Sequence, residues 1–172
     1  MKTVCAWCGK LLDDSDNGRD SGGKPISHGI CPDCARRLLL TQARPLRRFL
    51  NRFAEPVFLV NAEGRVIAGN AAALSALGKK PEEVDDKLGG DAIGCRWASL
   101  PGGCGKTVHC KTCTIRNTVT NTINTGKSNI KVPAYPDLAN ITGDFRIRFL
   151  ITTEKAGEGV LLRIDEIKQE RA

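Results

Sequence analysis

Residues 56–70 read Pro-Val-Phe-Leu-Val-Asn-Ala-Glu-Gly-Arg-Val-Ile-Ala-Gly-Asn, and this stretch decides the fold of most of the chain. Two short apolar runs, 56–60 and 65–69, flank a four-residue segment in which Gly64 is free to adopt a positive φ. That pattern predicts an antiparallel hairpin. Asn70 then stands where a helix N-cap is expected, with a short helix over 71–77 that ends at Gly78.

The pattern of mixed α and β segments continues to the end of the sequence. Pro81 starts another helical turn, and a longer helix is expected from about Cys110 to Asn124. Three β segments follow near 129–134, 143–153 and 158–166, and apolar residues alternate with arginines over residues 145–149. This alternation predicts strands with one buried and one wet face.

The order of elements, together with residues 56–73, Leu77-Gly78 and Pro81-Glu82-Glu83, resembles a PAS domain over residues 45–167. The resemblance implies a five-stranded antiparallel sheet with flanking helices, whose concave face forms a sensory pocket. PAS domains bind haem, flavin, metabolites or iron–sulfur clusters, or only a partner protein, so the fold alone does not settle the function. Many dimerise through a helix placed where residues 46–53 stand here. Residues 163–172 resemble the exit from a PAS sheet into a signalling helix.

Eight cysteines form two groups of four, and the first group is Cys5, Cys8, Cys31 and Cys34. Two Cys-x-x-Cys pairs supply a complete tetrahedral thiolate shell, which indicates a structural zinc site. Redox-active pairs are the alternative, and His28 is a candidate donor beside the site. The segment resembles a small cysteine-rich module that accompanies PAS domains in bacterial sensors. We therefore predict a zinc-ribbon-like module over 1–40, a basic linker helix over 41–54, the PAS domain over 55–167 and a C-terminal tail over 168–172.

The second group, Cys95, Cys104, Cys110 and Cys113, has irregular gaps and is interrupted by glycines. In a PAS domain this loop would line the sensory pocket. An iron–sulfur cluster tolerates irregular spacing and is favoured; a second zinc ion and a metal-free thiol switch remain open. His109 precedes the last pair, which does not suit covalent haem attachment, and it is expected as a ligand or as a donor to a cluster sulfur. Trp97 is expected to serve in packing.

The connection over residues 35–54 holds six arginines and no acid. After Pro45, apolar residues recur at helical spacing, so this face should be buried against the PAS domain or a second subunit. Arg47, Arg48 and Arg52 are expected on the opposite, wet face, where phosphate contacts are possible but not favoured. Asp85 and Asp86 are expected to be solvated.

Composition limits the function. No apolar run reaches the roughly 20 residues of a membrane span, and the first residues lack an apolar signal segment. Free cysteines in this number favour a reducing, cytoplasmic location. With two histidines and no nucleophile pattern, the chain has little acid–base equipment, so we expect no enzyme.

The sequence therefore predicts a cytoplasmic PAS-type sensor. Its metal centre would report redox or gas state to a signalling partner, in a protein that is expected to be a homodimer. The alternatives are a zinc-dependent transcriptional or nucleic-acid-binding regulator and a thiol oxidoreductase that uses Cys110 and Cys113.

Overall fold

The computed structural model describes residues 2–14 and 26–171, with side chains for all of these except residues 14, 36 and 39–44. The chain divides into two compact units, Met1–Arg44 and Pro45–Ala172. None of the helices in the described residues combines the length and hydropathy needed to cross a membrane.

The first unit is a small three-stranded sheet followed by a helix. Strand β1 (Lys2–Cys5) lies in the centre, antiparallel to β2 (Leu11–Asp14) and parallel to β3 (Ile26–Gly29). Helix α1 (Pro32–Leu50) begins directly after Cys31, much earlier than the expected start at residue 41. Pro32 suits the first helical position and Asp33 suits the positive end of the helix dipole, so the sequence supports this earlier start.

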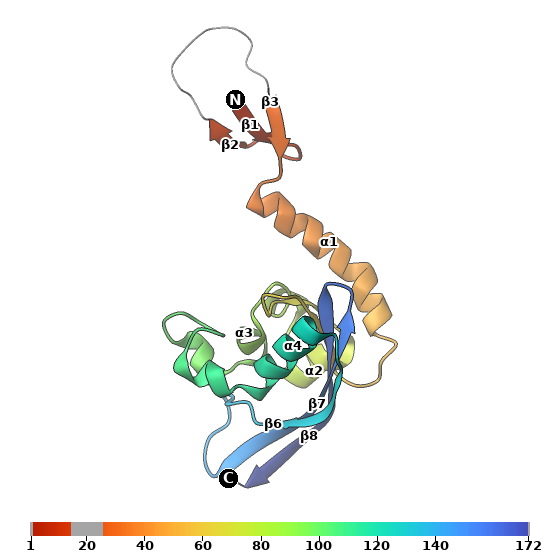
Figure 1. Ribbon diagram of the computed structural model, residues 1–172, viewed down its shortest axis with the longest axis vertical. Coiled ribbons are helices and arrows are strands. Elements are labelled where there is room, and N and C mark those ends of the chain that lie inside the picture. Colours follow the sequence, from red (N-terminus) through yellow and green to blue (C-terminus); the bar gives the residue numbers. More distant parts are fainter. Residues whose placement is uncertain (1, 15–25, 172) are drawn as a thin grey trace. The chain divides into compact units, whose positions relative to one another are not determined.

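The second unit is built on a five-stranded antiparallel sheet with the order β5-β4-β8-β7-β6 (Figure 1). Its strands are β4 (Val57–Val60), β5 (Val66–Gly69), β6 (Asn129–Ala134), β7 (Phe145–Ala156) and β8 (Gly159–Arg171). The two longest strands, β7 and β8, form a hairpin in which Ala156 pairs with Gly159 and Phe145 with Arg171.

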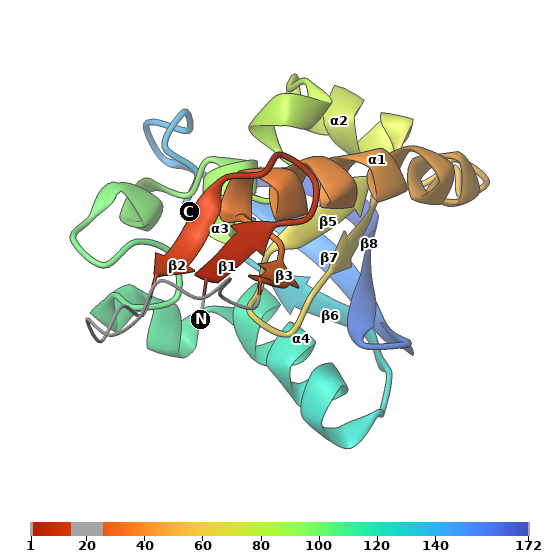
Figure 2. The same cartoon turned by 90° about the horizontal axis from the view of Figure 1, so that it is seen from above.

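Helices pack on one face of this sheet. The longer ones are α2 (Ala71–Leu77), α3 (Gly89–Ile93) and α4 (Thr114–Thr125), and three short 3-10 helices lie between them: η1 (Pro81–Glu83), η2 (Arg96–Ser99) and η3 (Val108–Thr112). Helix α2 contacts β4 and β5, whereas α4 contacts β6, β7 and β8, and Figure 2 shows the two helices well apart. The core between the layers includes Phe58, Phe149, Ile151 and Val119.

This arrangement confirms the predicted fold class, an α+β PAS domain preceded by a small cysteine-bearing module. The hairpin turn is present, because the Gly64 peptide N–H donates to Asn61 O at a φ of +80° for Gly64. Asn70 caps α2 through its side chain, which accepts from the Ala73 N–H, and Gly78 ends the helix in the left-handed conformation. Local sequence signals therefore placed this part of the chain correctly.

Two expected elements differ. The helix expected from Cys110 is split into η3 and α4, with Cys113 in extended backbone between them. Residues 163–171 continue β8 as a strand and do not leave the sheet as a helix. Cross-strand pairs explain this: Phe149 faces Ile167 on one side, while Arg148 pairs with Glu166 and Glu170 (both 2.7 Å) on the other.

The last residues of α1, from Pro45 on, belong to the second unit and are held within it by polar contacts as well as by the fully buried Leu50. The Arg47 guanidinium donates through Nη2 to both carboxylate oxygens of Asp85 (2.8 and 2.6 Å) and through Nε to Gly69 O (2.9 Å). The expectation that Arg47 lies on the wet face and that Asp85 is solvated was wrong. Arg47 reaches across to Asp85, whose side chain is only 5% exposed.

Asn70 completes this junction. Its Nδ2 donates to three carbonyl oxygens, those of Leu50, Phe53 and Glu55, and its Oδ1 accepts from the Val57 N–H as well as from α2. A single buried amide therefore joins the end of α1, the first sheet strand and the first helix of the domain.

Candidate metal centres

The first cysteine group is brought together as predicted. The Sγ atoms of Cys5, Cys8, Cys31 and Cys34 all lie within 4.8 Å of one another, and Cys8 Sγ and Cys31 Sγ are 3.7 Å apart. Four thiolates at about 2.3 Å from one tetrahedral zinc ion have sulfur separations of about 3.8 Å. The spacing therefore fits a single ion and leaves no open coordination position.

Local structure explains how the two pairs meet. Cys5 ends β1 in a tight turn, where Gly9, at a φ of +71°, donates its N–H to Cys5 O. Cys31 stands just before α1 and Cys34 lies in its first turn, so the Cys34 N–H donates to Cys31 Sγ (3.4 Å). The second pair is thus presented by a helix N-terminus, whose free amides stabilise thiolates.

The metal-free thiols of this group differ in proton affinity. A hydrogen bond from the Cys31 backbone N–H, with others from the turn, lowers the pKa of Cys5 to about 6. Hydrogen bonding to the Cys31 side chain and burial raise the pKa of Cys34 to about 12. One thiolate is therefore ready at neutral pH while a neighbouring thiol keeps its proton until a cation replaces it.

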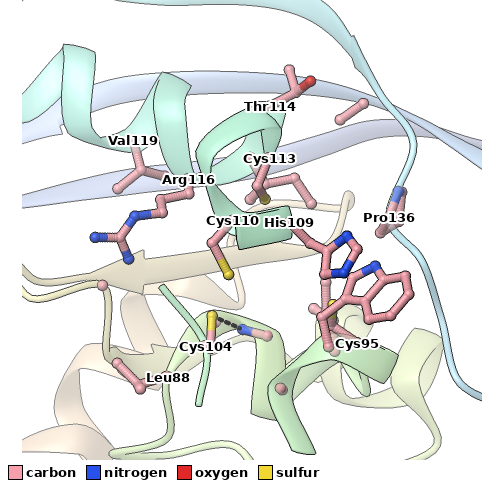
Figure 3. A pocket seen from close by; sticks show the side chains of 18 of the residues that line it. Leu88, Cys95, Cys104, His109, Cys110, Cys113, Thr114, Arg116, Val119 and Pro136 are labelled. Atoms are coloured by element: carbon pink, nitrogen blue, oxygen red, sulfur yellow. Dashed lines mark hydrogen bonds between the residues drawn. The ribbon is translucent and has the colours of Figure 1, made fainter. Parts of the chain in front are cut away.

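The second cysteine group lines a cavity of about 360 Å³ in the second unit. Cys95, Cys104, Cys110 and Cys113 all contribute to its wall, opposite apolar side chains from the sheet and from α4. In Figure 3 the sulfur atoms of Cys104 and Cys110 face each other from two separate segments of the loop. The prediction that this loop forms the wall of a pocket agrees with the structure.

Peptide groups are directed at two of these sulfurs. The Gly90 N–H donates to Cys104 Sγ (3.2 Å), and the Gly105 N–H donates to Cys110 Sγ (3.1 Å), which also contacts the Thr107 hydroxyl at 3.2 Å. A Cβ on Gly90 would lie 2.7 Å from Cys104 Sγ, so only glycine lets this amide approach the sulfur. Hydrogen bonds of this type to sulfur are among the interactions that tune metal clusters.

The four sulfurs of the second group are not gathered around one point. Among the described residues, only the first group has three or more ligand atoms within 4.8 Å of one another. A single zinc ion would require that short spacing, whereas a cluster of several metal and sulfide atoms holds its thiolates farther apart. The second group therefore lines one cavity with four thiols but lacks the short spacing that a single tetrahedral ion requires.

The environments of the second group are unequal. Burial raises the pKa of Cys104 and of Cys95, the latter also under the influence of Cys113. Burial also acts on Cys110, but hydrogen bonds from Thr107 and Gly105 outweigh it, with Arg116 adding to their effect, and the pKa of Cys110 is lowered. Of Cys95, Cys104 and Cys110, the last is consequently the thiol that most readily becomes a thiolate.

His109 lies at the rim of the pocket and is exposed. Its ring stacks on Trp97, with ring centroids 3.7 Å apart and an angle of 10° between planes, and Trp97 Nε1 donates to Asp137 Oδ2 (2.7 Å). Trp97 therefore packs, as expected, and none of the described sulfurs receives a hydrogen bond from His109. The role of His109 beside a metal centre stays a prediction.

Sequence reasoning missed Gly90 and Arg116 as parts of this site. Gly90 stands in Gly-Gly-Asp, where nothing local signals that its amide meets a cysteine 14 residues away. Arg116 follows the Cys-x-x-Cys pair by three residues on α4, which is the spacing that returns a side chain to the same face of a helix. That spacing was the one available signal for Arg116.

Comparison with known proteins gives matches in structure only. No family model matches the chain, and no curated protein matches it. The PAS domain of Bordetella pertussis BvgS is 15% identical, with 78% of this chain and 85% of that chain covered and a TM-score of 0.40. A PAS domain from Desulfitobacterium hafniense is 21% identical, covering 72% and 99%, with a TM-score of 0.42. A domain of a sensory box sensor histidine kinase/response regulator from Geobacter sulfurreducens is 16% identical, covering 74% and 96%, with a TM-score of 0.45.

Proposed function

We propose that this protein is a cytoplasmic PAS-type sensor that holds an iron–sulfur cluster in its pocket and a structural zinc ion in its N-terminal module. The observation that carries the proposal is the convergence of Cys95, Cys104, Cys110 and Cys113 on one cavity, with peptide amides directed at two of the sulfurs. We propose a regulatory role and no enzymatic one, because the described pocket residues include no nucleophile–base pair.

The cluster, when bound, would supply reversible one-electron chemistry or sensitivity to oxidising gases. The residues of this chain bind and orient it. Cys104 and Cys110 anchor two loop segments through their sulfurs, and the Gly90 and Gly105 amides fix the orientation of these thiolates. Release of the sulfurs removes the restraint that holds loop 94–113 against α3.

The signal has a short physical route out of the pocket. Gly90 lies in the segment that begins at Asp85, and this segment is fixed to β5 because Val66 N donates to Lys87 O and Asp86 N to Val66 O. Asp85 binds Arg47 on α1. We propose that a rearranged loop changes this contact and so changes how α1 pairs, in a homodimer or with a signalling partner protein. Phe49, 48% exposed on α1, is available for such pairing.

The test is the content of iron, acid-labile sulfide and zinc per chain in protein purified without oxygen. The proposal expects iron with matching sulfide and one zinc ion in the wild type. Cys110→Ser/Cys113→Ser should lose the iron and sulfide and keep the zinc. Cys31→Ser/Cys34→Ser should lose the zinc, which makes each double variant the matched control of the other.

Three results would contradict the proposal. Two zinc ions and no iron would make both groups zinc sites and remove the redox function. Iron that survives the Cys110→Ser/Cys113→Ser replacement would place the cluster elsewhere. A folded wild type with neither metal in the pocket would favour the thiol oxidoreductase that the sequence left open.

A further inference from the structure

Apart from its four cysteines, the pocket wall carries more carboxylates than permanently cationic side chains. Besides the four thiols, the pocket wall includes the carboxylates of Glu63 and Asp137, and its one arginine or lysine is Arg116. Asp137 is engaged by Trp97. Four thiolates would add four negative charges, so a permanent cation at this wall matters to any metal centre that they hold.

Arg116 is placed against the peptide that serves Cys110. A Cβ on Gly105 would lie 2.0 Å from Arg116 Nη1 and 2.9 Å from its Cζ, so the guanidinium occupies the space that a side chain at Gly105 would need. The amide of the same glycine donates to Cys110 Sγ. In Figure 3 the guanidinium points into the pocket on the side of Cys110.

The guanidinium is not neutralised by another part of the domain. No ion pair or hydrogen bond joins Arg116 to a carboxylate in the described residues. This differs from Arg47, Arg148 and Arg163, each of which binds an acid at 2.6 to 2.7 Å. The charge of Arg116 is thus available to the pocket and has no visible structural task in holding the fold.

We propose that Arg116 is the charge-compensating residue of the pocket and that it stabilises the reduced form of the metal centre. The inference rests on the proposed function, because it needs a redox-active group on the four cysteines. In the step concerned, one electron passes from a one-electron reductant to the cluster, with no bond broken and no proton moved. The added negative charge is attracted by the guanidinium, so Arg116 raises the reduction potential.

Arg116 and the cysteines have different roles in this site. The thiolates determine whether the centre assembles, whereas Arg116 determines at which ambient potential it changes state. A sensor needs the second property to be set independently of the first. A cation beside the ligands, in the first turn of the helix that follows Cys113, supplies it.

The test is a spectroelectrochemical titration of the whole, anaerobically purified protein, with dithionite as reductant. Arg116→Gln should lower the midpoint potential so that the oxidised-to-reduced ratio at a fixed potential rises about tenfold, or ~59 mV for one electron. Arg116→Lys should keep most of the wild-type potential. Lys111→Gln, which removes an exposed cation of the same loop outside the pocket wall, should leave it unchanged.

The outcomes are distinguishable from failure of the proposed function. A wild type without iron would contradict both the proposed function and the inference about Arg116. Iron-loaded Arg116→Gln with the wild-type potential overturns this inference alone. If Arg116→Gln loses iron and Arg116→Lys retains it, the charge is needed for assembly, which supports compensation by Arg116. Loss of iron in both variants overturns it, because shape and not charge would then be what matters.

Discussion

Replacement of Arg47 by methionine should destabilise the PAS domain strongly and in a pH-dependent manner. The change removes the guanidinium that contacts both oxygens of Asp85 and the carbonyl of Gly69, while it keeps a side chain of similar length. Asp85 would remain with its carboxylate 5% exposed and without its cation.

Two free-energy costs determine how much stability Arg47→Met should lose. Breaking a buried ion pair by removing one partner costs about 3–5 kcal/mol. Asp85 can avoid part of this by taking up a proton, which at pH 7 costs about 1.4 kcal/mol for each of the roughly 3 units between pH 7 and its ordinary pKa of about 3.9, or about 4 kcal/mol. The loss expected at pH 7 is therefore about 3–4 kcal/mol.

The pH dependence has a definite sign. In the wild type, burial raises the pKa of Asp85, and the Arg47 guanidinium offsets part of this rise. Without Arg47 the folded pKa rises further above the unfolded value, so the folded state binds the extra proton and stability falls as pH rises from about 4 to 7. At pH 5 the cost of protonating Asp85 is only about 1.5 kcal/mol, so the loss of folding stability should be less than half of the loss at pH 7.

The assay is urea unfolding at pH 5 and pH 7 in a Trp7→Phe background, where Trp97 is the one remaining tryptophan and reports on the second unit. Arg48→Met is the matched control, because Arg48 is the next residue of α1 and is exposed. Arg47→Met/Asp85→Asn should recover at least about 1.5 kcal/mol of the loss. A loss at pH 7 below about 1 kcal/mol, or one equal at both pH values, would refute the reasoning.

Three further outcomes follow from the contacts. Gly90→Ala should reduce iron per chain to below half of wild type, because the added Cβ would meet Cys104 Sγ. Gly89→Ala is the control, since the nearest atom to its Cβ lies 3.8 Å away, and it should keep its iron. Equal iron in both variants would contradict the pocket geometry. Zinc affinity of the N-terminal module, measured by chelator competition, should fall as pH is lowered from 8 to 6, because Cys34, with a pKa of about 12, must lose its proton to bind. A zinc affinity that does not change with pH would contradict this prediction. Asn70→Asp should cost about 3 kcal/mol in urea unfolding, since one buried and two partly buried carbonyls lose their donor, and a loss under about 1 kcal/mol would count against the junction.

The parts of the fold that the sequence predicted well are those that depend on local chemistry. Gly64 in its turn, Asn70 at its cap and Gly78 at its helix end each have a conformational reason that holds within a few residues. The Arg47–Asp85 pair has no such local reason. Its partners are 38 residues apart, and their contact depends on how α1 meets the segment after η1.

The extension of β8 was missed for a different reason. Resemblance to domains that continue into a helix favoured a helix here, and Ile164 and Ile167 are three residues apart, so they do not alternate as in a regular strand. In the structure a register shift opposite Leu150 and Ile151 takes up the extra residue. For the candidate site, cysteine spacing indicated a tetrahedral ion in the first group, and the resemblance to PAS domains indicated a pocket wall in the second. It could not give the distances between the sulfurs, which depend on tertiary packing of loop 94–113 and distinguish one ion from a larger group.

The strand order also bears on how the protein is synthesised. β4 lies beside β8, with Val57 paired to Arg163, so the early hairpin of β4 and β5 has no central partner until the last part of the chain leaves the ribosome. The β7–β8 hairpin is local and can form quickly, but all four pocket cysteines emerge before it. During translation these thiols face no completed sheet wall and are open to solvent and to oxidants. Under the proposed function, delivery of metal to the pocket would thus be a late event that competes with wrong thiol pairing in the nascent chain.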